Sequence, residues 1–186
     1  MREIKYITAE DLIKIVDIIN NLEYENKEEV PSYDTEMDAI DNYFSLIDRS
    51  KLNYYPDVLS KASFLFININ SHYFSNGNKR LSVTSTAYFL EMNGYTFKNI
   101  SKDEYKKIFN DIFGKTKVVD FSDFPSVNFA LYNLAIIVAS KAKESIDFDK
   151  FKEQITQFFR LSVVKEEKKS AFMRYSHKKE GKTLDV

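Results

Sequence analysis

The chain has 186 residues, 27 lysines and arginines against 28 aspartates and glutamates, and no cysteine. This length predicts one domain that can bury a core of its own, and the absence of cysteine excludes disulfides, cysteine metal sites and thiol catalysis. A formal net charge of −1 argues against a general nucleic-acid binder, so we expect no direct contact with nucleic acid.

Membrane insertion and secretion are not expected either. The most apolar run, residues 130–139, is too short to span a bilayer and contains Asn133. The first residues turn acidic where the apolar part of a signal peptide would begin. We therefore expect a soluble, cytoplasmic protein without membrane contact.

Charge is unevenly distributed along the chain. Residues 1–50 hold 13 acids and 5 bases, whereas the segment from Lys165 to the end holds 7 bases and 4 acids. Two interpretations remain open. The charges belong to two solvated faces, or a basic tail docks on an acidic N-terminal part of the same chain.

The chain contains only three prolines and four glycines, and long segments of helical periodicity dominate, which predicts an all-α fold. The first helix is expected from Thr8, which caps it, with Asp11 three residues later as a variant of the capping box. Its apolar face consists of Leu12, Ile15, Val16 and Ile19. A second helix is expected over residues 34–49.

Residues 50–57 interrupt this pattern. Pro56 suits the first turn of the next helix, and Tyr55 before it is restricted towards extended geometry. We therefore predict an extended loop or short hairpin at Asn53, Tyr54 and Tyr55. The next helix, over residues 56–70, is apolar nearly all round, which is typical of the buried centre of a bundle.

A second central helix is predicted over residues 78–93, with Gly94 as the glycine that ends it. Further helices are expected near 101–113, 123–142 and 147–163. We divide the chain into a helical domain over residues 1–145 and a C-terminal helical extension with a charged tail over residues 146–186.

The stretch SHYFSNGNKRLS, residues 71–82, joins the two central helices and begins the second one. A helix N-terminus presents unpaired N–H groups and a partial positive charge, so it binds anions and phosphates in particular. Gly77 lets the backbone approach a ligand closely, and Asn78 can cap the helix or donate to a phosphate oxygen. Lys79 and Arg80 oppose the helix dipole, which costs stability unless an anion lies nearby.

His72 lies at the start of this loop and is a candidate general base for a hydroxyl that attacks a phosphate. Phe74 can anchor the loop in the core. The pattern H-x-F-x-x-G-N-K-R is expected by chance in a chain of this length on the order of once in a hundred thousand sequences or less. The combination predicts phosphoryl or nucleotidyl transfer.

These residues resemble the Fic/Doc family, and within it the Doc (death-on-curing) toxin branch. The family motif is H-x-F-x-(D/E)-G-N-(G/K)-R, and the resemblance covers roughly residues 5–140. It implies a compact helical bundle with the motif loop between two central helices. It also implies a flap, here residues 53–55, that aligns the target chain by strand addition. In this resemblance His72 is the base, and Gly77, Asn78, Lys79 and Arg80 hold the phosphates of ATP.

Two positions depart from the family pattern. Asn76 stands where the family has an Asp or Glu that holds Mg²⁺, and a neutral amide binds this cation more weakly than a carboxylate does. Val83 stands where AMP-transferring Fic enzymes have an arginine that pairs with the γ-phosphate of ATP. Val83 and Lys79 both favour the Doc branch, which transfers the γ-phosphate itself.

The resemblance implies a toxin of a toxin–antitoxin system that uses ATP and Mg²⁺. It would phosphorylate a Thr or Ser hydroxyl of a target protein such as a translation elongation factor, with an antitoxin as a further partner. The alternatives are a Fic-type protein adenylyltransferase, or a nucleotide-binding protein whose catalysis is weakened by Asn76.

The tail contains SHKKEG, residues 176–181, which matches the inhibitory pattern (S/T)-x-x-x-E-(G/N) of Fic proteins. Ser176 and Glu180 are therefore candidate inhibitory residues. Looser matches at Ser32 with Glu36 and at Ser140 with Glu144 make the spacing weak evidence, and a solvated charged tail remains the other interpretation.

Overall fold

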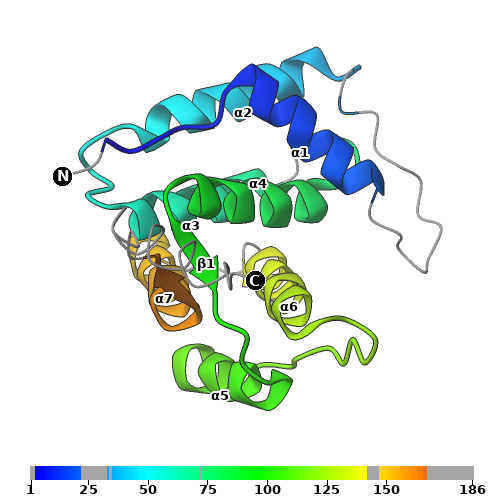
Figure 1. The fold of residues 1–186 in the computed structure, drawn as a ribbon, viewed down its shortest axis with the longest axis vertical. Coiled ribbons are helices and arrows are strands. Elements are labelled where there is room, and N and C mark those ends of the chain that lie inside the picture. Colours follow the sequence, from blue (N-terminus) through cyan, green and yellow to red (C-terminus); the bar gives the residue numbers. More distant parts are fainter. Residues whose placement is uncertain (1–2, 22–32, 34, 72, 142–146, 167–186) are drawn as a thin grey trace, which may run out of the picture.

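The structure, a computed structural model, describes residues 3–21, 33, 35–71, 73–141 and 147–166. Within these ranges the chain forms seven α-helices and two short strands (Figure 1). The elements are α1 (Ala9–Asn21), α2 (Met37–Ser50), α3 (Val58–Ile69), α4 (Asn78–Met92), β1 (Tyr95–Phe97), α5 (Lys102–Phe113), α6 (Ser126–Lys141), α7 (Phe148–Ser162) and β2 (Val163–Lys165). The prediction of an all-α fold is confirmed.

Side-chain caps explain where several helices begin. The Thr8 hydroxyl accepts a hydrogen bond from the Asp11 N–H (3.3 Å), and the Asp11 carboxylate accepts one from the Thr8 N–H (3.0 Å), which confirms the predicted capping box of α1. Asp57 caps α3 by accepting from the Ser60 N–H at 2.8 Å. Gly94, with φ of 79°, follows the end of α4 as predicted.

The helices form layers around the pair α3 and α4, which lie side by side in the middle of the molecule (Figure 1). On one side α1 packs on α4 and α2 packs on α3. On the other side α7 packs on α3 and α6 packs on α4, and α5 lies outside them. Within the described ranges, no helix combines the length and the apolar character that crossing a membrane would require.

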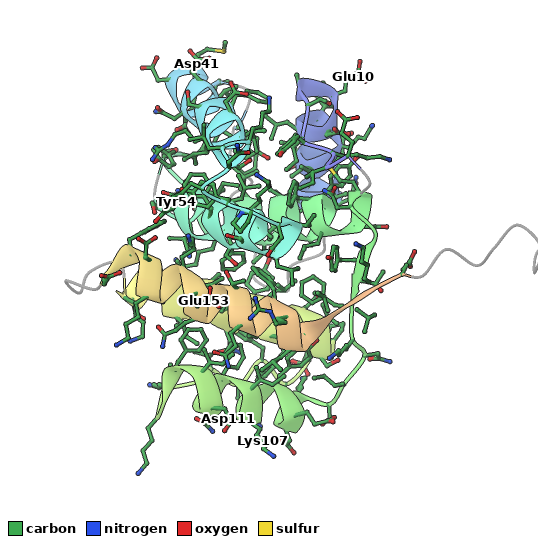
Figure 2. All side chains as sticks on the ribbon, turned by 90° about the vertical axis from the view of Figure 1, so that its left-hand side faces the viewer. Glu10, Asp41, Tyr54, Lys107, Asp111 and Glu153 are labelled. Atoms are coloured by element: carbon green, nitrogen blue, oxygen red, sulfur yellow. The ribbon has the colours of Figure 1, made fainter. Side chains whose placement is uncertain are left out.

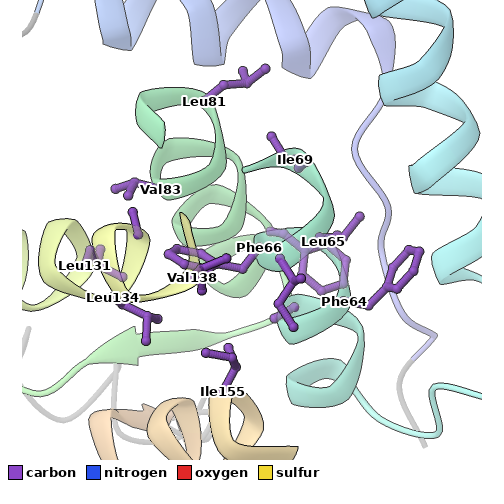
Figure 3. Packing of buried hydrophobic residues seen from close by; sticks show 14 of the residues in the cluster. Phe64, Leu65, Phe66, Ile69, Leu81, Val83, Leu131, Leu134, Val138 and Ile155 are labelled. Atoms are coloured by element: carbon purple, nitrogen blue, oxygen red, sulfur yellow. The ribbon is translucent and has the colours of Figure 1, made fainter. Parts of the chain in front are cut away.

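The core is centred on α3, whose side chains are buried almost all round, as predicted. Leu134 and Val138 of α6 and Ile155 of α7 are part of the same cluster (Figure 3). Ile155, Phe158 and Phe159 of α7 have no exposed surface. Helix α7, which the sequence assigned to a C-terminal extension, therefore shares the core of the preceding residues.

Of the two alternatives predicted for residues 53–55, an extended loop or a short hairpin, the hairpin is wrong, because residues 51–57 form turns without a strand. The buried Lys61 explains this geometry, since its ammonium group donates to the carbonyls of Ser50 (2.6 Å) and Leu52 (3.2 Å). The Tyr55 ring also packs on Phe64, with ring centroids 4.4 Å apart. These contacts hold residues 51–57 against the N-terminal half of α3.

A small antiparallel sheet, which the sequence does not predict, pairs Thr96 of β1 with Val164 of β2. Strand β1 follows α4 after a two-residue turn, and β2 follows α7 directly. The sheet therefore joins the C-terminal ends of two helices from different layers.

Candidate anion-binding site

The motif loop is the connection between α3 and α4, and the structure describes residues 73–80 of the motif. The candidate base His72 and the candidate inhibitory residues Ser176 and Glu180 lie outside the described residues. The geometry of the site therefore rests on the loop after position 72 and on the first turn of α4.

Helix α4 begins without a side-chain cap. Gly77 is its N-cap residue and adopts a left-handed conformation (φ 76°, ψ 5°), which favours glycine. The Gly77 carbonyl accepts from the Leu81 N–H at 2.9 Å, which starts the hydrogen-bond ladder of the helix. The first-turn N–H groups have no side-chain acceptor among the described residues, so this end can receive an anion.

The Asn78 side chain closes the loop instead of capping the helix. Its Oδ1 accepts from the Phe74 N–H at 2.9 Å, and its Nδ2 donates to the Phe74 carbonyl at 2.6 Å. Asn78 is only 4% exposed. Its amide is thus committed to the loop backbone, and the contact it can offer a phosphate is its backbone N–H.

Two residues outside the loop hold it in place: Tyr33, which precedes α2, and Glu36, the N-cap residue of α2. The Tyr33 hydroxyl donates to the Gly77 carbonyl at 3.0 Å, and its ring contacts Phe74 edge-on at 5.2 Å. The Glu36 carboxylate accepts from the N–H and the hydroxyl of Ser75, at 2.8 and 2.5 Å, and these bonds lower its pKa. Neither role is predictable from local sequence, because each residue lies about forty positions from its partner.

The first turn of α4 carries two bases and no acid. Lys79 is exposed, whereas Arg80 is 6% exposed and lies largely inside the fold. A cation in this position opposes the helix dipole by typically about 0.3–1 kcal/mol. The turn is therefore favourable for an anion and unfavourable for the isolated helix.

The described residues do not form a resident Mg²⁺ site. Among them, no group of three or more His, Asp or Glu side chains is arranged so that it could hold a metal ion. The Asn76 Oδ1, which could have offered a metal ligand, accepts from the Gly77 N–H at 2.7 Å. Both oxygens of the nearby Glu36 carboxylate are bonded to Ser75.

The structure does not bring the predicted flap to the motif loop. Asn53, Tyr54 and Tyr55 precede α3 and the loop follows it, so the twelve residues of α3, about 18 Å, separate them. The Tyr54 hydroxyl instead donates to Asp149 of α7 at 2.5 Å. The Lys152 ammonium lies over the rings of Tyr54 and Tyr55, 4.6 and 5.0 Å from their centroids.

Val83 lies one turn into α4 and is 8% exposed, within the apolar core (Figure 3). It offers no charged group to a ligand at the motif loop. The only bases that α4 contributes near its N-terminus are therefore Lys79 and Arg80.

Comparison of the chain with known protein families, with curated proteins and with solved structures found no match.

Proposed function

We propose that this protein transfers the γ-phosphate of ATP to a hydroxyl group of a target protein, with the ATP phosphates bound at the N-terminus of α4. The observation that carries this proposal is the start of that helix. Gly77 leaves the end uncapped, and Lys79 and Arg80 place two bases in a first turn without an acid. Backbone N–H groups, the helix dipole and nearby bases are the features that bind phosphate in proteins.

The contacts around the loop support a site that is formed before the ligand arrives. Asn78 bonds both backbone groups of Phe74, Tyr33 bonds Gly77, and Glu36 bonds Ser75. A cradle fixed by such outer contacts binds with less loss of conformational entropy, and it stabilises developing charge without first reorganising. These residues position the loop and are not themselves assigned to catalysis.

The resemblance to the Doc branch supplies the reaction. The hydroxyl oxygen of a Thr or Ser of the target bonds to the γ-phosphorus of ATP. The bond from that phosphorus to the oxygen bridging it to the β-phosphate breaks, and ADP leaves. His72 takes the proton of the attacking hydroxyl. Mg²⁺ enters as part of the MgATP substrate, because the described residues do not form a site for it. A translation elongation factor as target and an antitoxin as regulator follow from the same resemblance.

Phosphate transfer is preferred over AMP transfer because Val83 gives the γ-phosphate no charged partner. A second candidate, nucleotide binding without transfer, is supported by a different observation. Asn76 provides no carboxylate, and its oxygen already accepts from the Gly77 N–H. Replacing Asn76 by Asp distinguishes the two candidates, since a large gain of transfer would indicate a natural site that binds but transfers poorly.

The test uses ATP labelled at either the α- or the γ-phosphate, incubated with the protein, Mg²⁺ and a bacterial lysate. The proposal predicts protein labelling from γ-labelled ATP alone, and loss of that labelling in His72→Ala. Labelling from α-labelled ATP would contradict phosphate transfer and establish AMP transfer. ATP binding without either label would favour the second candidate.

A further inference from the structure

We propose that the C-terminal segment, residues 167–186, docks on an acidic face formed by α1 and α2 of the same molecule. We define this acidic face by the exposed carboxylates of Glu10, Asp17, Asp38, Asp41 and Asp48. The proposal does not depend on the transfer reaction.

The two helices form one outer layer of the molecule. Both lie on the same side of α3 and α4 (Figure 1). Glu10 and Asp41 project at the same end of the molecule (Figure 2). Within the described part of the chain, Asp48 has a salt bridge with Lys51. Glu10 interacts electrostatically with Lys14, whereas Asp17, Asp38 and Asp41 form no salt bridge with any other described residue.

Apolar side chains accompany these carboxylates. Ile13 of α1 is 64% exposed, and Met37 of α2 is 63% exposed. Large apolar side chains with so much exposed surface, placed among acids, suit a ligand that combines positive charge with apolar groups.

The C-terminal segment has this combination. Its sequence, EKKSAFMRYSHKKEGKTLDV, contains six lysines and arginines and three acids. Phe172, Met173 and Tyr175 lie between its basic residues. Charge complementarity and apolar anchors therefore both match the acidic face.

The point where the chain leaves the described fold is linked by hydrogen bonds to the segment that precedes α1. The Glu166 N–H donates to the Gly94 carbonyl at 2.8 Å, and the preceding Asn93 side chain bonds both backbone groups of Lys5. Lys5 lies four residues before the start of α1. Twenty residues reach up to about 66 Å when extended, whereas α1 and α2 are each about 20 Å long. Covalent attachment also raises the effective concentration of the segment to roughly millimolar, so modest contacts suffice.

The other outer helices are less complementary to a basic segment. Helix α5 has three acids and three bases, whereas α1 and α2 each have three acids and a single base, Lys14 and Arg49 respectively. In α7 the acids are likewise interspersed with lysines and an arginine. Their mixed charges would repel as well as attract the segment, and this favours α1 and α2 as its docking site.

The absence of cysteine allows a clean experiment. In a Ser170→Cys variant a nitroxide label attaches at that position alone, and it broadens the amide NMR signals of nearby residues. We expect selective loss of signal intensity for residues 10–17 and 38–48, with α5 unaffected. The effect should fade at 1 M salt, where the screening length falls to about 3 Å.

Two charge reversals complete the test. Asp38→Lys with Asp41→Lys should abolish the broadening, and adding Lys168→Glu with Lys169→Glu in the segment should restore it in part. Asp111→Lys on α5 is the matched control and should change nothing. Absence of the broadening, or broadening centred on other residues, would overturn the proposal.

Broadening in a mixture of spin-labelled and separately isotope-labelled protein would also overturn it, because that would mean contact between copies. Binding of the segment to anionic lipid vesicles with no broadening of α1 or α2 would also overturn it.

Discussion

The N-termini of α4 and α5 are built in opposite ways. At α5 the Ser101 side chain accepts from the Glu104 N–H, the Glu104 carboxylate accepts from the Ser101 N–H, and two acids lie in the first turn. At α4 the N-cap is Gly77, no side chain caps the end, and the first turn carries Lys79 and Arg80.

This comparison of the two N-termini shows that the features that stabilise a helix start differ from those that a ligand site requires. The α5 terminus satisfies its own N–H groups and complements its dipole, so local sequence suffices to begin the helix there. At the α4 terminus no side chain of the described residues accepts from the first-turn N–H groups, and the loop before it depends on contacts from outside the helix, including Tyr33 and Glu36. Such a locally unfavourable start is expected where function requires it.

The largest effect should come from the amide that closes the motif loop. Replacing Asn78 by Ala leaves the buried N–H and carbonyl of Phe74 without partners, at a cost of about 2–4 kcal/mol in the free energy of unfolding. ATP binding should be lost as well. Urea unfolding and calorimetric titration measure the two effects.

Asn133 provides the matched control. Its buried amide bonds the N–H and carbonyl of Val119, far from the motif loop in sequence and on a different helix. Asn133→Ala should destabilise the protein comparably and leave the ATP affinity of the folded protein unchanged. Equal loss of ATP affinity in both variants would show that the motif loop has no special role.

At the start of α1, the Asp11 carboxylate should make the free energy of unfolding depend on pH. Burial raises the pKa of Asp11, but hydrogen bonds from Thr8, Tyr88 and Lys14 outweigh it and lower the pKa from 3.8 to about 2. Because the folded value is the lower one, the stabilisation is present above pH 4 and is lost as the pH falls towards 2.

Between pH 5 and pH 2, the wild type should therefore lose about 1–2 kcal/mol more stability than Asp11→Asn. Parallel urea titrations at several pH values measure this difference. Identical slopes for the two proteins would contradict a role for the Asp11 carboxylate in stabilising the start of α1.

A smaller effect is expected at the start of α5. Ser101→Ala removes the acceptor for the Glu104 N–H and should lower the free energy of unfolding by about 1 kcal/mol. ATP affinity should stay the same, since this helix end is already satisfied by its own side chains. A change in ATP affinity would break the distinction between the two helix starts.

The sequence predicts the parts of the fold that depend on neighbouring residues, and it does not predict those that depend on contacts between distant segments. Periodicity and caps such as Thr8 with Asp11 gave the helices in their order, and Gly94 gave the end of α4. The strands were missed because three residues carry too little pattern, and β1 pairs with β2 across nearly seventy positions. The hairpin prediction failed because Lys61 and Phe64 fold residues 51–57 onto α3.

The same limit applies to the site. The sequence predicts that residues 71–82 join two central helices, and in the structure this connection lies between α3 and α4. The roles of Tyr33 and Glu36 depend on contacts between distant segments, which no local spacing encodes. Asn78 was expected to cap the helix or bind phosphate, but its buried amide bonds the loop backbone.

If α4 begins with bases because an anion binds there, Lys79→Glu should separate the stability of the helix from the binding of the ligand. Lys79 is exposed, so the variant should fold, and its carboxylate should complement the helix dipole. Unfolding free energies would be measured without nucleotide and with MgATP, beside Lys107→Glu, an exposed control within α5. We predict that Lys79→Glu is about 0.3–1 kcal/mol more stable than the wild type without nucleotide, yet binds MgATP at least about tenfold more weakly. A variant that loses stability, or that MgATP stabilises as much as it does the wild type, would contradict the account.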